Sequence, residues 1–371
     1  MNVPFLDLRA AYLELKHDID AATSRVLDSG RYLLGPELAA FETEWAAYCG
    51  ARHCVAVGSG CDALELALRA MDIGPGDEVI VPAHTFAATW LAVSATGAEP
   101  VAVEPEPTTF TLDPERVEAA ITSRTRVILP VHLYGHPADL AALSEVAERH
   151  GVRILEDAAQ AHGAQAYGRR VGAWSTTAFS FYPGKNLGGF GDGGAVVTDD
   201  AELAERVRLL RNYGSREKYR HEVRATNSRL DELQAAVLRV KLAHLDAWTE
   251  RRTAVAARYL DGLAGLDGPD GIVLPRPAPW AEPVWHLFVI RSADRSALRE
   301  RLAAAGVETL IHYPVPVHRS EAYAGSRQAA RAQPVAERLA REVLSLPMGP
   351  HLSDDAVTAV IEAVRGAVAA C

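Results

Sequence analysis

The sequence has few cysteines, and their spacing excludes several kinds of site. Only four occur in 371 residues, at Cys49, Cys54, Cys61 and Cys371. None belongs to a C-x-x-C pair, and His53 beside Cys54 has no second Cys/His pair that would complete a zinc site. We therefore expect free thiols in a reducing cytoplasm and no bound metal.

The chain also lacks an excess of positive charge and long apolar runs. Lys and Arg number 38 against 48 Asp and Glu, which gives a net charge of −10. We therefore do not expect a nucleic-acid binder, which needs a broad basic face. The apolar runs are too short to span a membrane, and the mixed start MNVPFLDLRAAYLEL does not have the pattern of a signal peptide.

A regular alternation of two kinds of segment begins at residue 53. The runs HCVAV, DEVIVPA, EPVAVEP, TRVILPVH, VRILEDAA and TTAFSFYP have the pattern of strands. CDALELALRAM, the segment Thr85–Ala95 and ADLAALSEVAERHG have the pattern of helices, the last one ending at a glycine. This alternation predicts an α/β fold with a mostly parallel sheet covered by helices.

The pattern changes near Leu245. Residues 229–252 predict one long amphipathic helix, after which Pro- and Gly-rich loops follow. VWHLFVI, ALRERLAAAG and VETLIHY then predict a strand, a helix and a second strand. A chain of this length suggests two domains, so we expect a large domain over 1–245 and a smaller C-terminal α/β domain over 246–371.

Three segments could carry chemistry. The first is Gly58–Asp62, GSGCD, where a predicted strand runs into a helix. Backbone N–H groups at a helix N-terminus favour an anion such as phosphate. An ordinary strand-to-helix turn with a capping residue would have the same pattern, so this segment alone does not decide.

The second segment, VRILEDAAQAHGA, places Asp157 at the end of a predicted strand. Ligands of open parallel sheets bind outside the carboxyl ends of the strands. A carboxylate among alanines is costly there unless it meets a positive partner. A capping or salt-bridged aspartate is the alternative.

The third segment is the glycine-rich stretch SFYPGKNLGGFGDGG, residues 180–194, which contains Lys185. A lysine in a tight, partly apolar loop has a lowered pKa and can act as a nucleophile, although a solvated loop lysine is commoner. Residues 189–194 also fit G-x-G-x-x-G, but the dinucleotide pattern must open a helix. Gly194 leads instead into a predicted strand, which argues against a nicotinamide enzyme.

Together these segments supply the groups that pyridoxal phosphate needs. Lys185 offers an amine for the aldehyde, and Asp157 a carboxylate for the pyridine nitrogen. The N–H groups near Gly60 and the hydroxyl of Ser180 suit the phosphate. PAHTFAATW offers an aromatic partner for the ring, either Phe86 or His84.

A basic cluster follows over residues 211–229. Two glutamates, Glu217 and Glu222, stand against six cations: Arg211, Arg216, Lys218, Arg220, Arg224 and Arg229. Tyr213, Tyr219 and His221 are interleaved. A substrate with phosphates and rings would suit this cluster, and a solvated basic loop is the alternative.

These motifs closely resemble the DegT/DnrJ/EryC1/StrS family of sugar aminotransferases, a fold-type I pyridoxal-phosphate group. The resemblance runs from FLDL to LSLPMGP and includes GSGCDALELAL, EDAAQAHGA, FSFYPGKNLGGFGDGGAV and HYPVPVH. It implies a large domain with a mostly parallel mixed sheet between helices, plus a smaller C-terminal α/β domain. It is strongest to members that aminate C3 of dTDP-3-keto-6-deoxyhexoses for antibiotic sugars.

The resemblance also implies roles for individual residues. Lys185 would form the Schiff base with pyridoxal 5′-phosphate and move the proton, and Asp157 would pair with the pyridinium nitrogen. The other cofactor contacts would be Gln160 at the phenolic oxygen, Phe86 on the ring, and Gly60, Cys61 and Ser180 at the phosphate. The family often has threonine in place of Cys61, so we expect slightly weaker cofactor binding.

The resemblance further implies a homodimer with shared active sites. Asn227 would reach the phosphate of the neighbouring subunit, and Tyr219, His312 and Tyr313 would lie near the sugar nucleotide. The implied reaction is a ping-pong transamination with L-glutamate as donor and a dTDP-keto-6-deoxysugar as acceptor.

Of three alternatives to this function, the sequence leaves one open and argues against the other two. C4 aminotransferases share every residue named above, so amination at C4 stays open. Dehydratases of the family carry histidine in place of Lys185, which disfavours that branch. A non-catalytic regulator that binds the cofactor is opposed by the intact set of Asp157, Ser180 and Lys185.

Overall fold

A computed structural model describes residues 2–268 and 271–369. Its largest element is a seven-stranded sheet with the order β1-β9-β8-β5-β4-β2-β3. The strands are β1 (His53–Val57), β2 (Glu78–Pro82), β3 (Glu99–Val103), β4 (Thr125–Ile128), β5 (Arg153–Asp157), β8 (Thr176–Ser180) and β9 (Gly194–Thr198). The pairs from β8 to β3 are parallel, and β9 is antiparallel to both its neighbours. The predicted mostly parallel sheet is confirmed.

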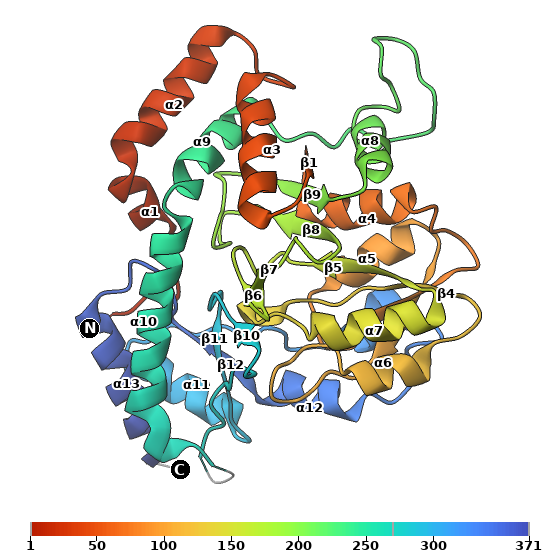
Figure 1. Cartoon of the computed structure of the whole chain (residues 1–371). Coiled ribbons are helices and arrows are strands. Elements are labelled where there is room, and N and C mark those ends of the chain that lie inside the picture. The colour runs from red at the N-terminus through yellow and green to blue at the C-terminus, as the bar shows by residue number, and fades with distance from the viewer. Residues whose placement is uncertain (1, 269–270, 370–371) are drawn as a thin grey trace.

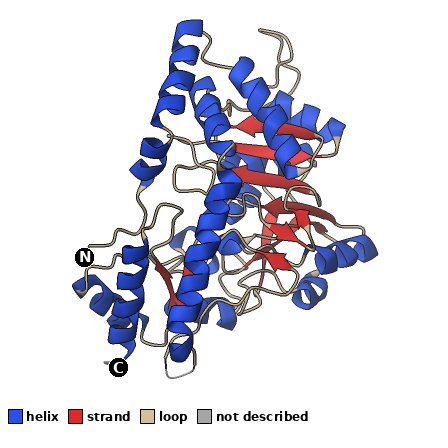
Figure 2. Ribbon diagram, turned by 60° about the vertical axis from the view of Figure 1, so that its left-hand side comes forward, coloured by secondary structure: helices blue, strands red, loops and turns tan. Residues whose placement is uncertain are grey.

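The helices pack on both faces of this sheet (Figure 2). Within the described part of the chain they are α1 (Leu8–Glu14), α2 (Lys16–Ser29), α3 (Pro36–Cys49), α4 (Gly60–Ala70), α5 (Ala87–Ala95), α6 (Pro114–Ala120), α7 (Leu140–His150), α8 (Ala201–Leu210), α9 (Glu232–Leu242), α10 (Leu245–Leu263), α11 (Arg295–Ala304), α12 (Pro334–Glu342) and α13 (Asp354–Ala369). None of these helices is both long and apolar enough to cross a membrane.

Successive strand residues enter two different apolar cores, because side chains alternate across a strand. In β1, Val55 and Val57 join the core beneath α4 and α5, whereas Cys54 and Ala56 join the core beneath α3. In β8, Ala178 and Phe179 divide in the same way. A sheet buried on both faces explains why its strands were visible as nearly continuous apolar runs.

A second, smaller sheet pairs β11 (Phe288–Arg291) with β12 (Val343–Leu346) in antiparallel fashion. Its apolar core contains residues of α10, α11 and α13, and also Val3 from the start of the chain. Figure 1 shows α10 running beside α13, with both ends of the chain close by. A third sheet joins β10 (Ala281–Glu282), β6 (Gln165–Ala166) and β7 (Arg169–Arg170). The division of the chain after residue 245 stays a prediction.

The single long helix predicted over residues 229–252 was wrong. The structure has two helices, α9 and α10, separated at Ala243 and His244. The two helices share a core on both sides of the break, where Val237 of α9 and Trp248 of α10 pack with Leu15 and Ile19. Further along α10, Val255 packs in the core of the small sheet. The apolar pattern that predicted one helix continues across the break because residues on both sides of it pack in the same core.

The second strand predicted at VETLIHY was also wrong. Residues 307–313 form only isolated bridges, Val307 with Val3 and Leu310 with Ser345. The partner of β11 is β12 instead. Of this described segment, Leu310 alone pairs with β12, and the backbone carbonyl of His312 accepts a hydrogen bond from the hydroxyl of Tyr134 rather than from a neighbouring strand.

Candidate active site

One cavity of about 490 Å³ lies at the carboxyl ends of β5 and β8. Nine residues singled out from the sequence line it: Gly60, Cys61, Phe86, Asp157, Gln160, Ser180, Lys185, His312 and Tyr313. Parallel strands whose carboxyl ends meet at one edge place these side chains together. Another pocket, lined by Phe110, Tyr134 and Trp285, holds only about 30 Å³ and is too small for a cofactor.

The N-terminus of α4 forms one wall of the cavity. Ser59 caps this helix, its side chain accepting from the N–H of Asp62. Within the described chain, the N–H groups of Gly60 and Cys61 have no acceptor and lie at the first turn, as expected for the unpaired donors of a helix start. These donors and the hydroxyl of Ser180 form a site for an anion.

Gly60 and Gly194 allow the neighbouring chain segments of this wall to pack closely against each other. A Cβ on Gly60 would lie 2.5 Å from the Cβ of Ser180. A Cβ on Gly194 would lie 2.3 Å from the carbonyl oxygen of Ser59. Neither glycine has a positive φ, so both are needed for close approach rather than for an unusual backbone angle. Gly194 opens β9, which confirms that the G-x-G-x-x-G match does not open a helix.

Asp157 ends β5 and is buried, with 5% of its surface exposed. Thr89 donates to its Oδ2 at 2.8 Å, and the N–H of Ala159 donates to its Oδ1 at 3.1 Å. Burial raises the pKa of this carboxyl, and those two donors, together with the charge of Lys185, partly offset the rise. A carboxylate held in this way suits a cationic ring nitrogen.

Lys185 follows β8 on a turn in which its N–H donates to the carbonyl of Tyr182. Burial lowers the pKa of Lys185 from 10.5 to about 8, and the charge of Asp157 acts in the opposite direction. A lysine with this pKa has a substantial fraction of neutral, nucleophilic amine near neutral pH.

Gln160, which follows β5, and Tyr313, which lies between α11 and β12, contact each other at the cavity. The side chain of Gln160 donates from Nε2 to the hydroxyl of Tyr313 at 3.1 Å. The ring of Tyr313 lies 5.4 Å from the ring of Phe86, which is 54% exposed at the cavity wall. His84, the other aromatic candidate, does not line the cavity and contacts Tyr134 instead. The structure therefore favours Phe86 as the ring partner.

Asn227 and Tyr219 do not line the cavity. Both are exposed, Tyr219 with 84% of its surface accessible, and Asn227 bridges to Asn212. The basic cluster is also smaller than the sequence indicated, because Arg211 is buried in an ion pair with Glu42 and donates to the carbonyl of Ala56. A contact of Asn227 with a second subunit stays a prediction.

Several cavity residues were not anticipated from the sequence. Tyr182 and Asp192 line the cavity, and Thr89 holds Asp157 from α5. Thr89 lies in the first turn of α5, and Thr85 lies just before this helix, with the two hydroxyls 3.1 Å apart. The sequence shows the two threonines, but it does not show that Thr89 donates to Asp157 on β5.

The sequence pattern of the DegT/DnrJ/EryC1/StrS aminotransferase family matches residues 14–365. The chain belongs to this family. A relative from Streptomyces venezuelae, dTDP-3-amino-3,4,6-trideoxy-alpha-D-glucose transaminase, is 66% identical over 98% of this chain and 96% of its own length. The erythromycin biosynthesis sensory transduction protein EryC1 of Saccharopolyspora erythraea is 64% identical over 98% of this chain and 99% of its own length.

The fold comparison agrees with the family. The crystal structure of S. venezuelae DesV in complex with a ketimine intermediate superposes with a TM-score of 0.97. It is 65% identical and covers 99% of this chain and 98% of that one. The expected fold-type I aminotransferase architecture is confirmed.

Members of this family depend on pyridoxal 5′-phosphate, and solved relatives hold its amine form. The cavity fits this group. It offers unpaired N–H donors and a hydroxyl for the phosphate, the buried carboxylate of Asp157 for the ring nitrogen, and the amine of Lys185 for the aldehyde.

Proposed function

We propose that this protein transfers an amino group from L-glutamate to C3 of a dTDP-linked 3-keto-6-deoxyhexose. The observation that carries the proposal is the pairing of Lys185 and Asp157 in one cavity, in a chain 66% identical to a dTDP-3-amino-3,4,6-trideoxyglucose transaminase. The product would be a 3-amino sugar of the kind that antibiotic pathways attach.

Lys185 and Asp157 take the two central roles in this proposal. When bound, pyridoxal phosphate supplies an electron sink that stabilises negative charge on the carbon losing a proton. Asp157, fixed by Thr89 and Ala159, would hold the ring nitrogen in its protonated form. Lys185 would hold the aldehyde through its amine, and as a free amine it would take and return the proton as general base and acid. Its pKa of about 8 suits both directions near neutral pH.

The remaining contacts follow from the cavity walls. Gly60 and Cys61 would bind the phosphate through their N–H groups and Ser180 through its hydroxyl. Phe86 would pack against the ring, and Gln160 would reach the phenolic oxygen.

We also propose that the active unit is a homodimer in the cytoplasm. Asn227 of one subunit would then reach the phosphate bound by the other. Tyr219, His312 and Tyr313 would contact the sugar nucleotide. His312 and Tyr313 are supported by their place in the cavity wall, whereas Tyr219 is supported by its exposure beside Lys218 and Arg220.

The test is incubation of the protein with L-glutamate and either a 3-keto or a 4-keto dTDP-6-deoxysugar, followed by NMR of the product. We expect an amino group at C3 from the 3-keto sugar alone. Amination only at C4 would replace the proposed substrate. Cofactor binding without amination of either sugar would favour the regulatory alternative.

A further inference from the structure

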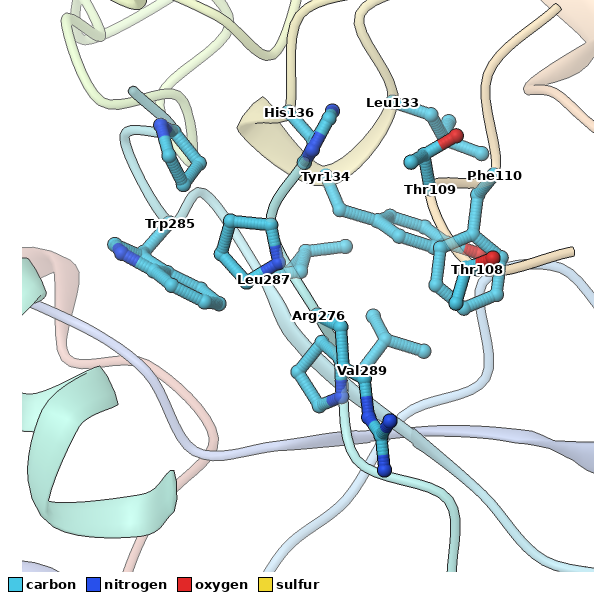
Figure 3. Close-up of a pocket in the computed structure, with 13 residues that line it drawn as sticks. Thr108, Thr109, Phe110, Leu133, Tyr134, His136, Arg276, Trp285, Leu287 and Val289 are labelled. Carbon is cyan, nitrogen blue, oxygen red and sulfur yellow. The ribbon is translucent and has the colours of Figure 1, made fainter. Parts of the chain in front are cut away.

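Tyr134 is a buried tyrosine with an unusual backbone conformation behind the cavity wall. It lies in the short turn Leu133–Gly135 with a φ of 61°. A bulky residue in this left-handed region stores strain, and such strain clusters at functional sites. Its ring lies 5.1 Å from that of Phe110, beside the small pocket in Figure 3. Packing against Phe110 therefore holds the ring.

The backbone of Tyr134 fixes the orientation of the Gln160 amide. The N–H of Tyr134 donates to Oε1 of Gln160 at 2.6 Å. Since a backbone N–H needs an acceptor, the atom facing it is the oxygen, and the nitrogen must face the other way. Nε2 donates one hydrogen to the hydroxyl of Tyr313 at 3.1 Å. Its second hydrogen has no acceptor within the described chain, so Gln160 presents an N–H to the cavity.

The hydroxyl of Tyr134 connects the segment that contains His312 to Tyr134 and Gln160. It donates to the carbonyl oxygen of His312. Because a hydroxyl has one hydrogen, Nε2 of His84, 2.8 Å from the same oxygen, must be the donor of their bond. Burial lowers the pKa of His84 to about 4, so its ring is neutral with the hydrogen on Nε2. His312 is held on its other side by Ser345, whose Oγ lies 2.8 Å from Nδ1.

We propose that Tyr134, with His84 behind it, is a positioning residue that makes Gln160 a hydrogen-bond donor to the cofactor and holds the His312–Tyr313 wall against it. This inference rests on the proposed function, because the group that Gln160 faces is the cofactor. Tyr134 itself does not line the large cavity and acts through Gln160, His312 and Tyr313.

The test compares Tyr134→Phe with a matched control, Tyr259→Phe. Tyr259 is also buried and also donates its hydroxyl to a backbone carbonyl, that of Pro347, but it does not line the cavity. We expect Tyr134→Phe to raise the dissociation constant of pyridoxal phosphate about tenfold, the effect of one ordinary hydrogen bond. The backbone N–H of residue 134 still holds Oε1 of Gln160 in this variant, but the lost hydroxyl bond frees the carbonyl of His312 and so loosens Tyr313, the partner of Nε2 of Gln160. The pH midpoint of the visible band of bound cofactor should therefore rise, because a donor that favours an ionised phenolic oxygen is held less firmly. Tyr259→Phe should change neither.

A second measurement uses the cofactor-free protein. Hydrogen exchange over residues 310–313 should become faster in Tyr134→Phe and also in His84→Leu, which removes the Nε2 donor to the Tyr134 hydroxyl. Should Tyr134→Phe fail to fold, His84→Leu carries the same test with a smaller disturbance. Equal midpoints, affinities and exchange rates in the wild type and both variants would overturn the inference. Failure of the wild type to bind the cofactor would instead contradict the proposed function.

Discussion

The hydroxyl of Thr89 donates to Oδ2 of Asp157 at 2.8 Å, and both residues are buried. Behind it, the hydroxyl of Thr85 lies 3.1 Å from that of Thr89. With the N–H of Ala159 on Oδ1, each carboxylate oxygen has a fixed donor. The charge of Asp157 is therefore oriented before a ligand arrives, although burial alone would favour the protonated acid.

Replacing Thr89 by Val should raise the pKa of Asp157 further, because it removes a donor that favours the ionised form. Since the carboxylate is lost as pH falls through its pKa, the acid limb of the kcat/KM profile should move to higher pH. Thr85→Val keeps the hydroxyl of Thr89 and is the control. Identical profiles for the two variants would count against a direct role of the Thr89 hydroxyl.

Replacing Lys185 by Ala should abolish the visible absorbance of covalently held cofactor and lower turnover by at least about 10² to 10⁴-fold, the usual contribution of a general acid–base. Lys16→Ala is a suitable control, because Lys16 lies on the surface, where it contacts its helix neighbour Asp20 and the ring of Tyr12, and it does not line the cavity. An unchanged spectrum in the Lys185 variant would sink the assignment of the covalent lysine.

Replacing Asp157 by Asn should lower the pKa of Lys185 below about 8, because the negative charge of Asp157 raises it. The pH dependence of acylation of Lys185 in cofactor-free protein, followed by mass spectrometry, measures this. Lys241, whose pKa is also about 8 but is lowered by burial alone, is the internal control. The midpoint for Lys241 should not move. An unchanged midpoint for Lys185 would show that the two groups do not interact.

Replacing Cys61 by Thr should strengthen cofactor binding by up to about tenfold, since a hydroxyl adds one hydrogen bond at the phosphate. Cys61→Ala removes the sulfur without adding a hydroxyl, so it should leave the dissociation constant nearly unchanged. Equilibrium dialysis of the two variants and the wild type decides. Equal affinities for threonine and alanine would place the side chain of residue 61 away from the phosphate.

Replacing Asn227 by Asp should weaken cofactor retention in the dimer, because it would place a carboxylate beside the neighbouring subunit's phosphate. Asn227→Ala loses the amide without adding charge and should retain more cofactor. The difference between the two should shrink at high salt, since exposed charges are screened. Full retention by Asn227→Asp would contradict the contact across subunits.

The large sheet and the centre of the site could be predicted because local pattern and position agree there. Asp157 and Ser180 end neighbouring parallel strands. Because the carboxyl ends of parallel strands meet at one edge of the sheet, the two residues lie at the same ligand-binding edge. The break between α9 and α10 could not be predicted, since neither proline nor glycine occurs at Ala243 or His244 and the apolar pattern continues across it into a shared core.

Contacts between distant side chains were equally invisible in the sequence. VETLIHY has the composition of a strand, yet the carbonyl of His312 is used by Tyr134 instead of by a ladder. Arg211 stands among exposed cations in the sequence, but its guanidinium pairs with Glu42 beneath the surface. In each case the deciding partner lies more than 160 residues away along the chain.

The segment 307–313, which closes the cavity, comes late in the chain, and this affects the order in which the site forms during synthesis. The helix N-terminus at Gly60, the carboxylate of Asp157 and the amine of Lys185 all precede residue 190, whereas the wall made by His312 and Tyr313 is translated about 130 residues later. Because domains fold as they emerge from the ribosome, the nascent large sheet would already carry the phosphate cradle and the lysine on an open face. The enclosed cavity exists only once the chain has nearly reached its end.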